Sequence, residues 1–207
     1  MRIGLFGGSF DPVHLGHLLV AESCREQGRL DRVIFMPAAV PPHKQDRPLT
    51  PAAHRVAMLT LAIGGHDAFV VATDEIDRGG VSYTVDTLER MQAAHAGDTL
   101  LLILGPDAIR EFSAWREPER ILDLADLLVV EREGLDDIAA LERDVAIVAA
   151  VGAERLARII DTRVRMPAVG IRASGLRAAV AEGKSIRYRT PRAVEAYIAA
   201  HGLYRNA

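Results

Sequence analysis

The stretch Gly7-Gly8-Ser9-Phe10-Asp11-Pro12-Val13-His14-Leu15-Gly16-His17 decides the fold that we predict for this chain. The apolar run at residues 3–6 precedes it and is typical of a buried first strand. The two glycines after that run predict a sharp turn, where the backbone can approach a ligand with no Cβ in the way. The stretch therefore indicates a strand followed at once by a ligand-binding turn.

A helix is expected directly after this turn. Asp11 is a suitable N-cap, and Pro12 suits the first helical position, where its missing N–H costs nothing. His14 and His17 would then lie three residues apart on one helix face, near the positive end of the helix dipole. Two imidazoles at a helix start indicate a phosphate-binding site.

Two other interpretations of the histidine pair are weaker. The pair could be half of a zinc site, but no pattern of Cys or carboxylate residues completes one. The histidines could also be ordinary surface residues, yet Gly16 between them and the Gly-Gly pair before them serve no evident packing need.

The rest of the chain alternates short strand-like runs with helical patterns, which predicts an α/β protein with a doubly wound, mostly parallel sheet. The expected strands are residues 3–6, 32–36, 69–72, 99–104 and 126–130. The expected helical segments are residues 13–27, 52–63, 85–94, 108–112, 117–124 and 193–200. In such sheets ligands bind at the carboxyl ends of the strands, so the loops after the first four strands should meet at one site. The proline-rich segment 37–51 and the segment 73–82 are expected to be loops, and the alanine-rich stretch 135–158 is expected to be mainly helical.

Composition limits the class of protein. A chain of 207 residues with 49% hydrophobic and 26% charged residues suits a single domain spanning 1–207. A net charge of −3 gives no general attraction to nucleic acid or to an anionic membrane. Cys24 is the only cysteine, no apolar run reaches the roughly 18 residues of a membrane span, and no signal-peptide pattern precedes the first strand. We therefore expect a cytoplasmic protein.

The opening stretch resembles the signature of the HxGH nucleotidylyltransferase superfamily, whose members transfer a nucleotidyl group from a nucleoside triphosphate to a phosphate or similar acceptor. The resemblance implies a Rossmann-like nucleotidylyltransferase fold with a small C-terminal helical portion. In this fold the part from about residue 164 to 207 would complete the ATP site.

Three later runs resemble one family within it, the bacterial nicotinate mononucleotide adenylyltransferases of NAD biosynthesis. They are Pro41-Pro42-His43-Lys44, Ser82-Tyr83-Thr84-Val85-Asp86-Thr87, and Gly105-Pro106-Asp107 followed by Phe112 and Trp115. Without the resemblance, these runs would also suit a solvated loop, a helix start capped by Ser82 or Thr84, and a packing tryptophan. The carboxylates at Asp74, Glu75 and Asp77 suggest a cation site less strongly than they suggest a solvated loop.

A second superfamily signature, Ile-Ser-Ser-Thr-x-Ile-Arg, corresponds here to the run from Ile171 to Arg177. Ser174 can replace the threonine hydroxyl and Arg177 keeps the final arginine, whereas Arg172 and Ala173 replace the two serines. The surrounding segment 163–192 holds eight basic residues and one acid, and a triphosphate is a more economical partner for it than nucleic acid.

The resemblance implies adenylyl transfer from ATP to nicotinate mononucleotide, with Mg²⁺ bound mainly through the ATP phosphates and no metal site in the protein. The implied catalytic residues are His14, His17 and Lys44. The implied ATP-binding residues are Gly7, Gly8, Ser9, Phe10, His14, His17, Gly105, Asp107, Ser174 and Arg177. The implied mononucleotide-binding residues are His43, Lys44, Tyr83, Thr84, Asp107 and Trp115. Neither nucleic acid nor membrane is an expected partner, and the sequence does not decide between a monomer and a homo-oligomer.

Two alternatives stay open at this point. One is another small adenylyl- or cytidylyltransferase of the superfamily, such as the phosphopantetheine enzyme. The other is a nucleotide-sensing module that keeps the fold without catalysis.

Overall fold

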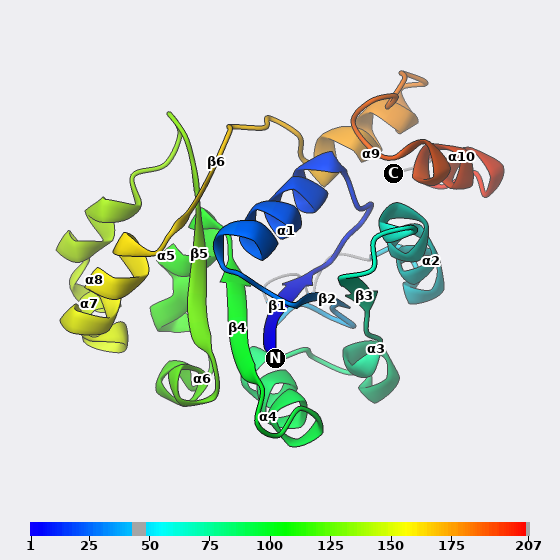
Figure 1. The fold of residues 1–207 in the computed structure, drawn as a ribbon. Helices are drawn as coiled ribbons and strands as arrows, with labels where there is room; N and C mark the ends of the chain where they lie inside the picture. Colours follow the sequence, from blue (N-terminus) through cyan, green and yellow to red (C-terminus); the bar gives the residue numbers. More distant parts are fainter. Residues whose placement is uncertain (43–48, 206–207) are drawn as a thin grey trace.

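The computed structural model describes residues 1–42 and 49–205, and its described strands form one parallel six-stranded sheet (Figure 1). These strands are β1 (Arg2–Gly8), β2 (Arg32–Pro37), β3 (Phe69–Val71), β4 (Thr99–Leu104), β5 (Asp126–Arg132) and β6 (Val164–Met166). Their order is β3-β2-β1-β4-β5-β6, so the winding direction reverses between β1 and β4. Leu5 of β1 is in register with Ile34 of β2 and with Leu102 of β4, which brings the carboxyl ends of these strands to one edge of the sheet. The predicted doubly wound parallel sheet is confirmed, and its reversal point marks the expected ligand site.

The helices connect these strands. They are α1 (Leu15–Gln27), α2 (Ala52–Ile63), α3 (Asp74–Arg78), α4 (Thr84–Ala94), α5 (Pro106–Glu111), α6 (Pro118–Leu124), α7 (Val145–Val151), α8 (Ala153–Asp161), α9 (Ala173–Ala181) and α10 (Arg192–Ala200), with 3₁₀ turns η2 (Phe112–Ala114) and η3 (Ile138–Arg143). The expectation of a loop over residues 73–82 is wrong, because α3 occupies half of it. Its Glu75 is buried and accepts a hydrogen bond from the Thr87 hydroxyl at 2.7 Å, a tertiary contact that the sequence pattern does not reveal. The alanine-rich stretch is helical as expected, in three pieces, and the short strand β6 that follows it was not predicted.

The C-terminal helical portion lies on the α1 side of the sheet, with α10 packed against α2 (Figure 1). Val194 and Ile198 of α10 are buried there in the same apolar cluster as Met58 and Leu59 of α2. After α10 the chain reverses at Gly202, whose φ of 62° lies in the left-handed region that favours glycine just after a helix end. The last described turn thereby comes back toward the N-terminal part of the chain.

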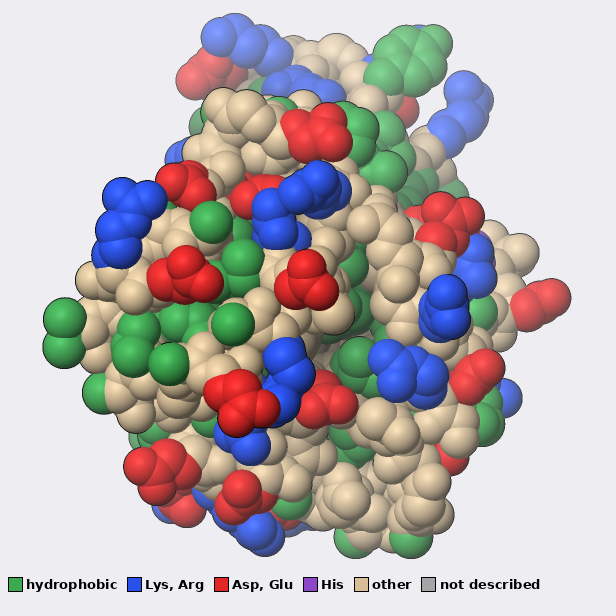
Figure 2. Space-filling model, turned by 60° about the vertical axis from the view of Figure 1, so that its left-hand side comes forward, with side chains coloured by type: hydrophobic (Ala, Val, Ile, Leu, Met, Phe, Trp, Pro, Cys, Tyr) green, Lys and Arg blue, Asp and Glu red, His purple; other side chains and the backbone are tan. Residues whose placement is uncertain are grey.

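Charged side chains of both signs are interspersed over the face that Figure 2 presents, consistent with the small net charge. In the part of the chain that the structure describes, no helix is long and apolar enough to cross a membrane.

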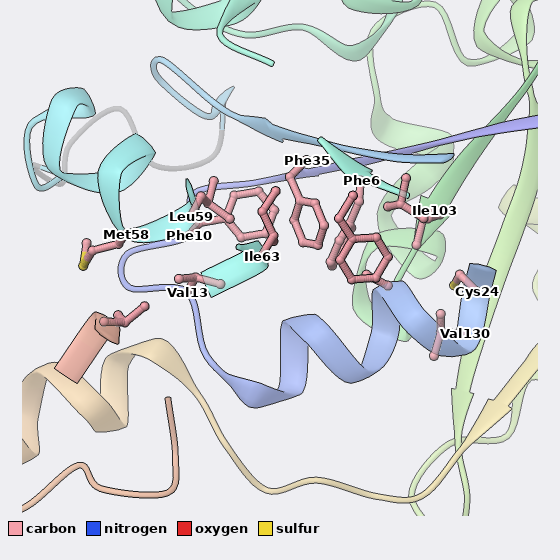
Figure 3. Close-up of a cluster of buried hydrophobic side chains, with 14 of the residues drawn as sticks. Phe6, Phe10, Val13, Cys24, Phe35, Met58, Leu59, Ile63, Ile103 and Val130 are labelled. Atoms are coloured by element: carbon pink, nitrogen blue, oxygen red, sulfur yellow. The ribbon is translucent and has the colours of Figure 1, made fainter. Parts of the chain in front are cut away.

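Alternate residues of the central strands pack on opposite sides of the sheet. Ile3 and Leu5 face the cluster formed with α4 to α8, whereas Phe6 faces the cluster formed with α1, α2, α9 and α10. In this second cluster Phe6, Phe10 and Phe35 form a triad with ring centroids 5.5 to 5.7 Å apart (Figure 3). Phe10 belongs to the opening stretch of the sequence, so its ring anchors that stretch in the core.

Candidate active site

The segment 9–14, which we call the motif loop, leaves the carboxyl end of β1. The prediction that Gly7 and Gly8 form the turn is wrong, because β1 continues through both of them. The left-handed residue is Phe10, with a φ of 46°, and its buried ring holds that conformation in place. Gly8 is required for a different reason: a Cβ there would lie 3.0 Å from a carbon of the Phe10 ring. A Cβ on Gly7 would meet no atom of the protein within 4 Å, so this position faces open space.

The helix α1 begins at Leu15, with His14 as its N-cap three residues after the predicted N-cap Asp11. Asp11 does not cap it because its carboxylate has other partners: Oδ2 accepts from the Thr50 amide at 3.1 Å, and Oδ1 accepts from the Tyr204 hydroxyl at 2.6 Å. The amide of Leu15 donates to the carbonyl of Arg189 at 3.1 Å instead of to a capping side chain. Contacts from distant parts of the chain thus decide where this helix starts.

His14 and His17 stack on each other at the start of α1, with ring centroids 3.7 Å apart and ring planes inclined by 22°. The His14 amide donates to Nδ1 of His17 at 3.2 Å, so neutral His17 carries its proton on Nε2. Gly16 allows this stacking, because a Cβ there would lie 3.0 Å from Nδ1 of His14 and 3.8 Å from the Ile171 carbonyl. The expectation that Gly16 serves no packing need is therefore wrong: the glycine leaves room for the His14 ring and lets the two sequence signatures lie side by side.

The environment of His14 keeps its imidazole neutral. The residue is 6% exposed, and its Nδ1 has no hydrogen-bond partner among the described residues. Burial lowers the pKa of His14 from 6.5 to about 4, since the charged imidazolium would lose its hydration there. At neutral pH this side chain can donate one hydrogen bond without carrying a charge.

The C-terminal part of the chain holds the motif loop from one side. Nη1 of Arg177 donates to the Asp11 carbonyl at 2.6 Å, and the Thr190 hydroxyl donates to the Val13 carbonyl at 2.8 Å. From the other side Arg55, which is 2% exposed, donates to the Ser9 carbonyl at 3.0 Å. Sequence reasoning missed Arg55 and Thr190, because neither lies in a recognisable motif.

The second signature runs into α9, whose N-cap is Arg172. Arg172 and Ser174 are both exposed, whereas Arg177 is half-buried beside the motif loop. The structure therefore brings Arg177 to the motif loop at the Asp11 carbonyl.

The run after β3 connects two neighbouring loops. The Ser82 hydroxyl accepts from the Ala39 amide at 3.0 Å, and the Ser82 amide donates to the Val40 carbonyl at 2.9 Å. The prediction that Ser82 or Thr84 caps α4 is wrong: Tyr83 is the N-cap and makes no side-chain capping bond, because the Ser82 hydroxyl is engaged with the loop after β2. Tyr83 and Thr84 remain half-buried at the helix start, where the first amides of α4 have no intrahelical partner.

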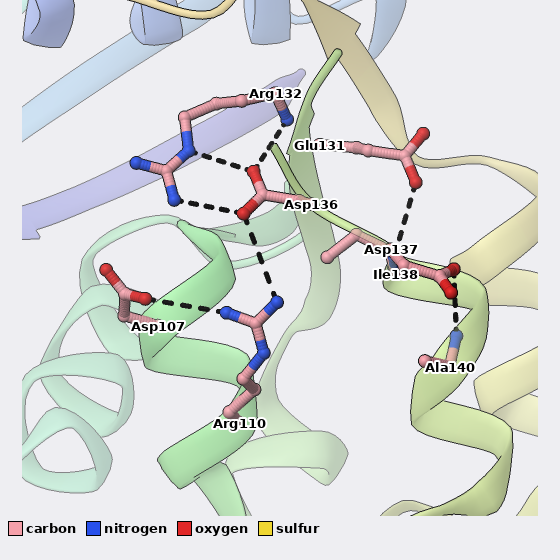
Figure 4. A network of polar contacts seen from close by, with 8 residues as sticks. All are labelled: Asp107, Arg110, Glu131, Arg132, Asp136, Asp137, Ile138 and Ala140. Carbon is pink, nitrogen blue, oxygen red and sulfur yellow. Dashed lines mark hydrogen bonds and ion pairs between the residues drawn. The ribbon is translucent and has the colours of Figure 1, made fainter. Parts of the chain in front are cut away.

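The loop after β4 carries Asp107 at the start of α5, with its side chain 85% exposed. Asp107 leads into a polar network that the sequence analysis did not find (Figure 4). Nη1 of Arg110 lies 3.5 Å from Asp107 and its Nη2 lies 3.9 Å from Asp136, while Arg132 binds Asp136 with two bonds of 2.8 and 3.0 Å. The Arg132 bonds hold the pKa of Asp136 below its usual range. The sequence signal for this network was Arg132 at the end of β5 with Asp136 four residues later.

Trp115 is half-buried and lies 5.5 Å from the ring of Phe112 between centroids. The guanidinium of the next residue, Arg116, lies 4.7 Å from the centre of the Tyr83 ring. The Trp115 and Tyr83 segments are therefore neighbours, as the resemblance implies.

Some expected site residues have no described position. His43 and Lys44 lie outside the described residues. Among the residues that are described, no group of three or more His, Cys, Asp or Glu side chains is placed to hold a metal ion.

The comparisons agree with this geometry at the level of class. The family model described as cytidylyltransferase-like matches residues 5–179, from β1 into α9. A solved structure from Vibrio parahaemolyticus, titled a putative nicotinate-nucleotide adenylyltransferase, aligns with a TM-score of 0.70 at 19% identity, over 100% of this chain and 96% of its own. The Plasmodium falciparum nicotinic acid mononucleotide adenylyltransferase complexed with NaAD aligns with a TM-score of 0.74 at 19% identity, over 99% and 97%. The fold, the histidine pair and the family match define a nucleotidyltransferase of the cytidylyltransferase-like class.

Two curated relatives narrow the class. Proteins from Thermomicrobium roseum and from Thermus thermophilus are each 45% identical over 205 residues, which cover 99% of this chain and 92% and 100% of theirs. Both carry the name "Probable nicotinate-nucleotide adenylyltransferase". This chain belongs to the nicotinate-nucleotide adenylyltransferase family.

Proposed function

We propose that the protein transfers the adenylyl group of ATP to nicotinate mononucleotide, giving nicotinic acid adenine dinucleotide and pyrophosphate in NAD biosynthesis. The assignment of these two substrates rests on the 45% identity to proteins named probable nicotinate-nucleotide adenylyltransferases, over nearly the whole chain. The stacked histidine pair at the carboxyl end of β1 supports the same chemistry.

In the proposed reaction an oxygen of the acceptor phosphate attacks the α-phosphorus of ATP in line. The new P–O bond forms as the bond to the bridging oxygen breaks, and the electron pair leaves with pyrophosphate. The acceptor is already anionic, so the protein needs no nucleophile of its own. Its task is to align the two phosphates and to stabilise the charge that develops on their oxygens.

His17 is the proposed principal donor, through Nε2, because its Nδ1 accepts the His14 amide. His14 is proposed to donate beside it as a neutral imidazole. Arg177 is proposed to reach the β- and γ-phosphates with the guanidinium that also holds the Asp11 carbonyl, since a guanidinium has five N–H donors in a planar fork. Lys44 is proposed to add a further positive charge.

The remaining ATP contacts follow the strand ends. Gly7, Gly8, Ser9 and Phe10 are proposed to offer backbone groups to the phosphates, since the Phe10 ring itself is in the core. Gly105 and Asp107 are proposed to contact the ribose, and the Ser174 hydroxyl to contact the phosphates, so that the part from about residue 164 to 207 completes the ATP site within one domain.

Nucleotidyltransferases generally act on a nucleoside triphosphate together with a divalent metal. We propose that the metal here is Mg²⁺ and that it arrives on the ATP phosphates, because phosphate oxygens and water are its preferred ligands. A cytoplasmic location completes the proposal, and the single cysteine, Cys24, which is a buried free thiol, suits a reducing compartment.

The proposed acceptor carries a pyridine carboxylate, which the start of α4 suits. The first amides of α4, near Thr84, lack intrahelical partners and can donate to a carboxylate at the positive end of the helix dipole. The amide form of the mononucleotide would turn its NH₂ group toward these donors. Tyr83, His43 and Trp115 are proposed to complete this pocket, with Trp115 stacked on the ring.

Pyrophosphate release with ATP and each mononucleotide in turn tests this proposal. One donor facing a donor costs roughly 1–3 kcal/mol, so two such mismatches should favour the acid in kcat/KM by about 10²-fold or more. A ratio near one would show that the start of α4 does not bind the carboxylate. Turnover with phosphopantetheine instead would point to the sister enzyme, and no turnover with any acceptor would point to a nucleotide sensor.

A further inference from the structure

The far C-terminal end of the described chain reaches back to the motif loop through one side chain. The Tyr204 hydroxyl donates to Oδ1 of Asp11 at 2.6 Å, across 193 residues of sequence. Tyr204 is 9% exposed and Asp11 is 3% exposed, so the bond is shielded from water. Tyr204 has a φ of 65°, in the left-handed region that a tyrosine seldom occupies. Such a backbone persists only where its surroundings hold it in place.

Asp11 is the point where three separate segments meet. Its Oδ2 accepts the amide of Thr50, which leads into α2, and its carbonyl accepts Nη1 of Arg177 from α9. Tyr204 supplies the third segment. His14 follows Asp11 by three residues, so any displacement of Asp11 moves the start of α1 and the stacked histidines.

The electrostatics of this junction favour the neutral form of the Tyr204 hydroxyl. Burial, and next the hydrogen bond to Asp11, raise the pKa of Tyr204 above its ordinary value. The Asp11 carboxylate in turn opposes the lowering of the Arg55 pKa that burial causes. A carboxylate buried in this way depends on each of its donors, because a lost donor leaves a charged oxygen without hydration.

We propose that Tyr204 is a positioning residue for the reaction: through Asp11 it fixes the motif loop so that His14 and His17 meet the transferring phosphate in the productive orientation. Tyr204 does not touch the substrates and acts only through Asp11. The inference deepens the proposed function and rests on it for the identity of the reaction.

The test variant is Tyr204→Phe, which keeps the buried ring and removes only the hydroxyl. The matched control is Tyr197→Phe on α10, because the Tyr197 hydroxyl is also hydrogen-bonded, to Nδ1 of His54 at 3.0 Å and not to a residue of the motif loop. A hydrogen bond to a charged group changes an equilibrium constant by about a factor of 10 or more. We therefore expect kcat to fall about 10-fold in Tyr204→Phe, with the KM values changing less. In Tyr197→Phe we expect kcat within about 2-fold of the parent chain.

Amide hydrogen exchange supplies a readout that needs no substrate. Exchange at residues 9–17 should be about 10-fold faster in Tyr204→Phe and unchanged in Tyr197→Phe. In an Asp11→Ala background, Tyr204→Phe should cause no further loss of kcat, because two residues that act through one bond are not additive. Should Tyr204→Phe fail to fold, Asp11→Ala removes the same bond from its other end, together with the Thr50 bond, and must show exchange that is at least about 10-fold faster.

The outcomes separate the two proposals. A parent chain without pyrophosphate release would contradict the proposed function, while the exchange comparison would still decide whether Tyr204 holds the loop. An unchanged kcat in Tyr204→Phe, or equal effects of the two tyrosine variants on exchange, would overturn the positioning role even in an active enzyme.

Discussion

The buried imidazole of His14 makes the stability of this protein depend on pH in a specific window. The pKa of His14 is about 4 in the folded chain, against 6.5 when the residue is hydrated. Between these values the unfolded chain binds a proton that the folded chain does not, so the free energy of unfolding rises with pH there. The His14 contribution is complete above pH 6.5 and is lost progressively as the pH falls toward 4.

The size of the effect follows from the two pKa values. Each unit of difference between the two pKa values is worth about 1.4 kcal/mol. The free energy of unfolding therefore falls by roughly 3 kcal/mol once the pH is below both pKa values, and by about 2 kcal/mol at pH 5. For a domain of this size, 2 kcal/mol is a shift in melting temperature of about 4–8 °C.

Urea unfolding of the parent chain and of His14→Gln, measured from pH 7.5 to pH 5, checks this prediction. Glutamine keeps a polar side chain of similar size and does not titrate, so subtraction removes the contribution of every other group. The parent chain should lose about 2 kcal/mol more than the variant over this range. Parallel curves for the two proteins, or a folded-state NMR titration of the His14 ring centred near 6.5, would refute the argument that burial keeps this imidazole neutral.

Three further substitutions test the site and its support. His17→Ala should lower kcat by roughly 10²–10³, the usual cost of one charge-stabilising donor, with little change in melting temperature; near-parental turnover would remove its catalytic role. Arg55→Met should lower the free energy of unfolding by about 2–4 kcal/mol in urea titrations, because the Ser9 and Thr50 carbonyls lose their buried donor, and unchanged stability would contradict that account. Arg177→Ala should raise KM for ATP far more than KM for the mononucleotide, and equal effects on both would refute its assignment to ATP.

The sequence predicted those parts of the fold that depend on local pattern. The alternation of apolar runs with helical segments was enough for the parallel sheet, because strands buried on both faces appear as continuous apolar stretches such as β4. α2 and β4 also have the predicted bounds, because local residues mark where they begin. A proline precedes α2, and polar residues precede β4.

The parts that were missed depend on contacts between distant residues. The start of α1 moved from Asp11 to His14 because Tyr204 and Thr50 engage the Asp11 carboxylate. β6 is three residues long and, among the described strands, pairs with the end of β5 alone, so it leaves almost no periodic signal. In the site, the histidine spacing was predicted from the sequence, but the stacking of the rings and the neutral state of His14 required the buried environment to be known.

The separation of 193 positions between Asp11 and Tyr204 has a consequence for synthesis. The ribosome makes the histidine pair long before it makes the tyrosine that holds Asp11. A nascent chain can therefore pair β1 with β2 early, while the motif loop lacks its last side-chain contact until the turn after α10 has emerged. A chain that stops short of this turn would carry every residue of the first signature but would lack the hydrogen bond from Tyr204 to Asp11. The motif loop can therefore complete its contacts only after translation has reached Tyr204.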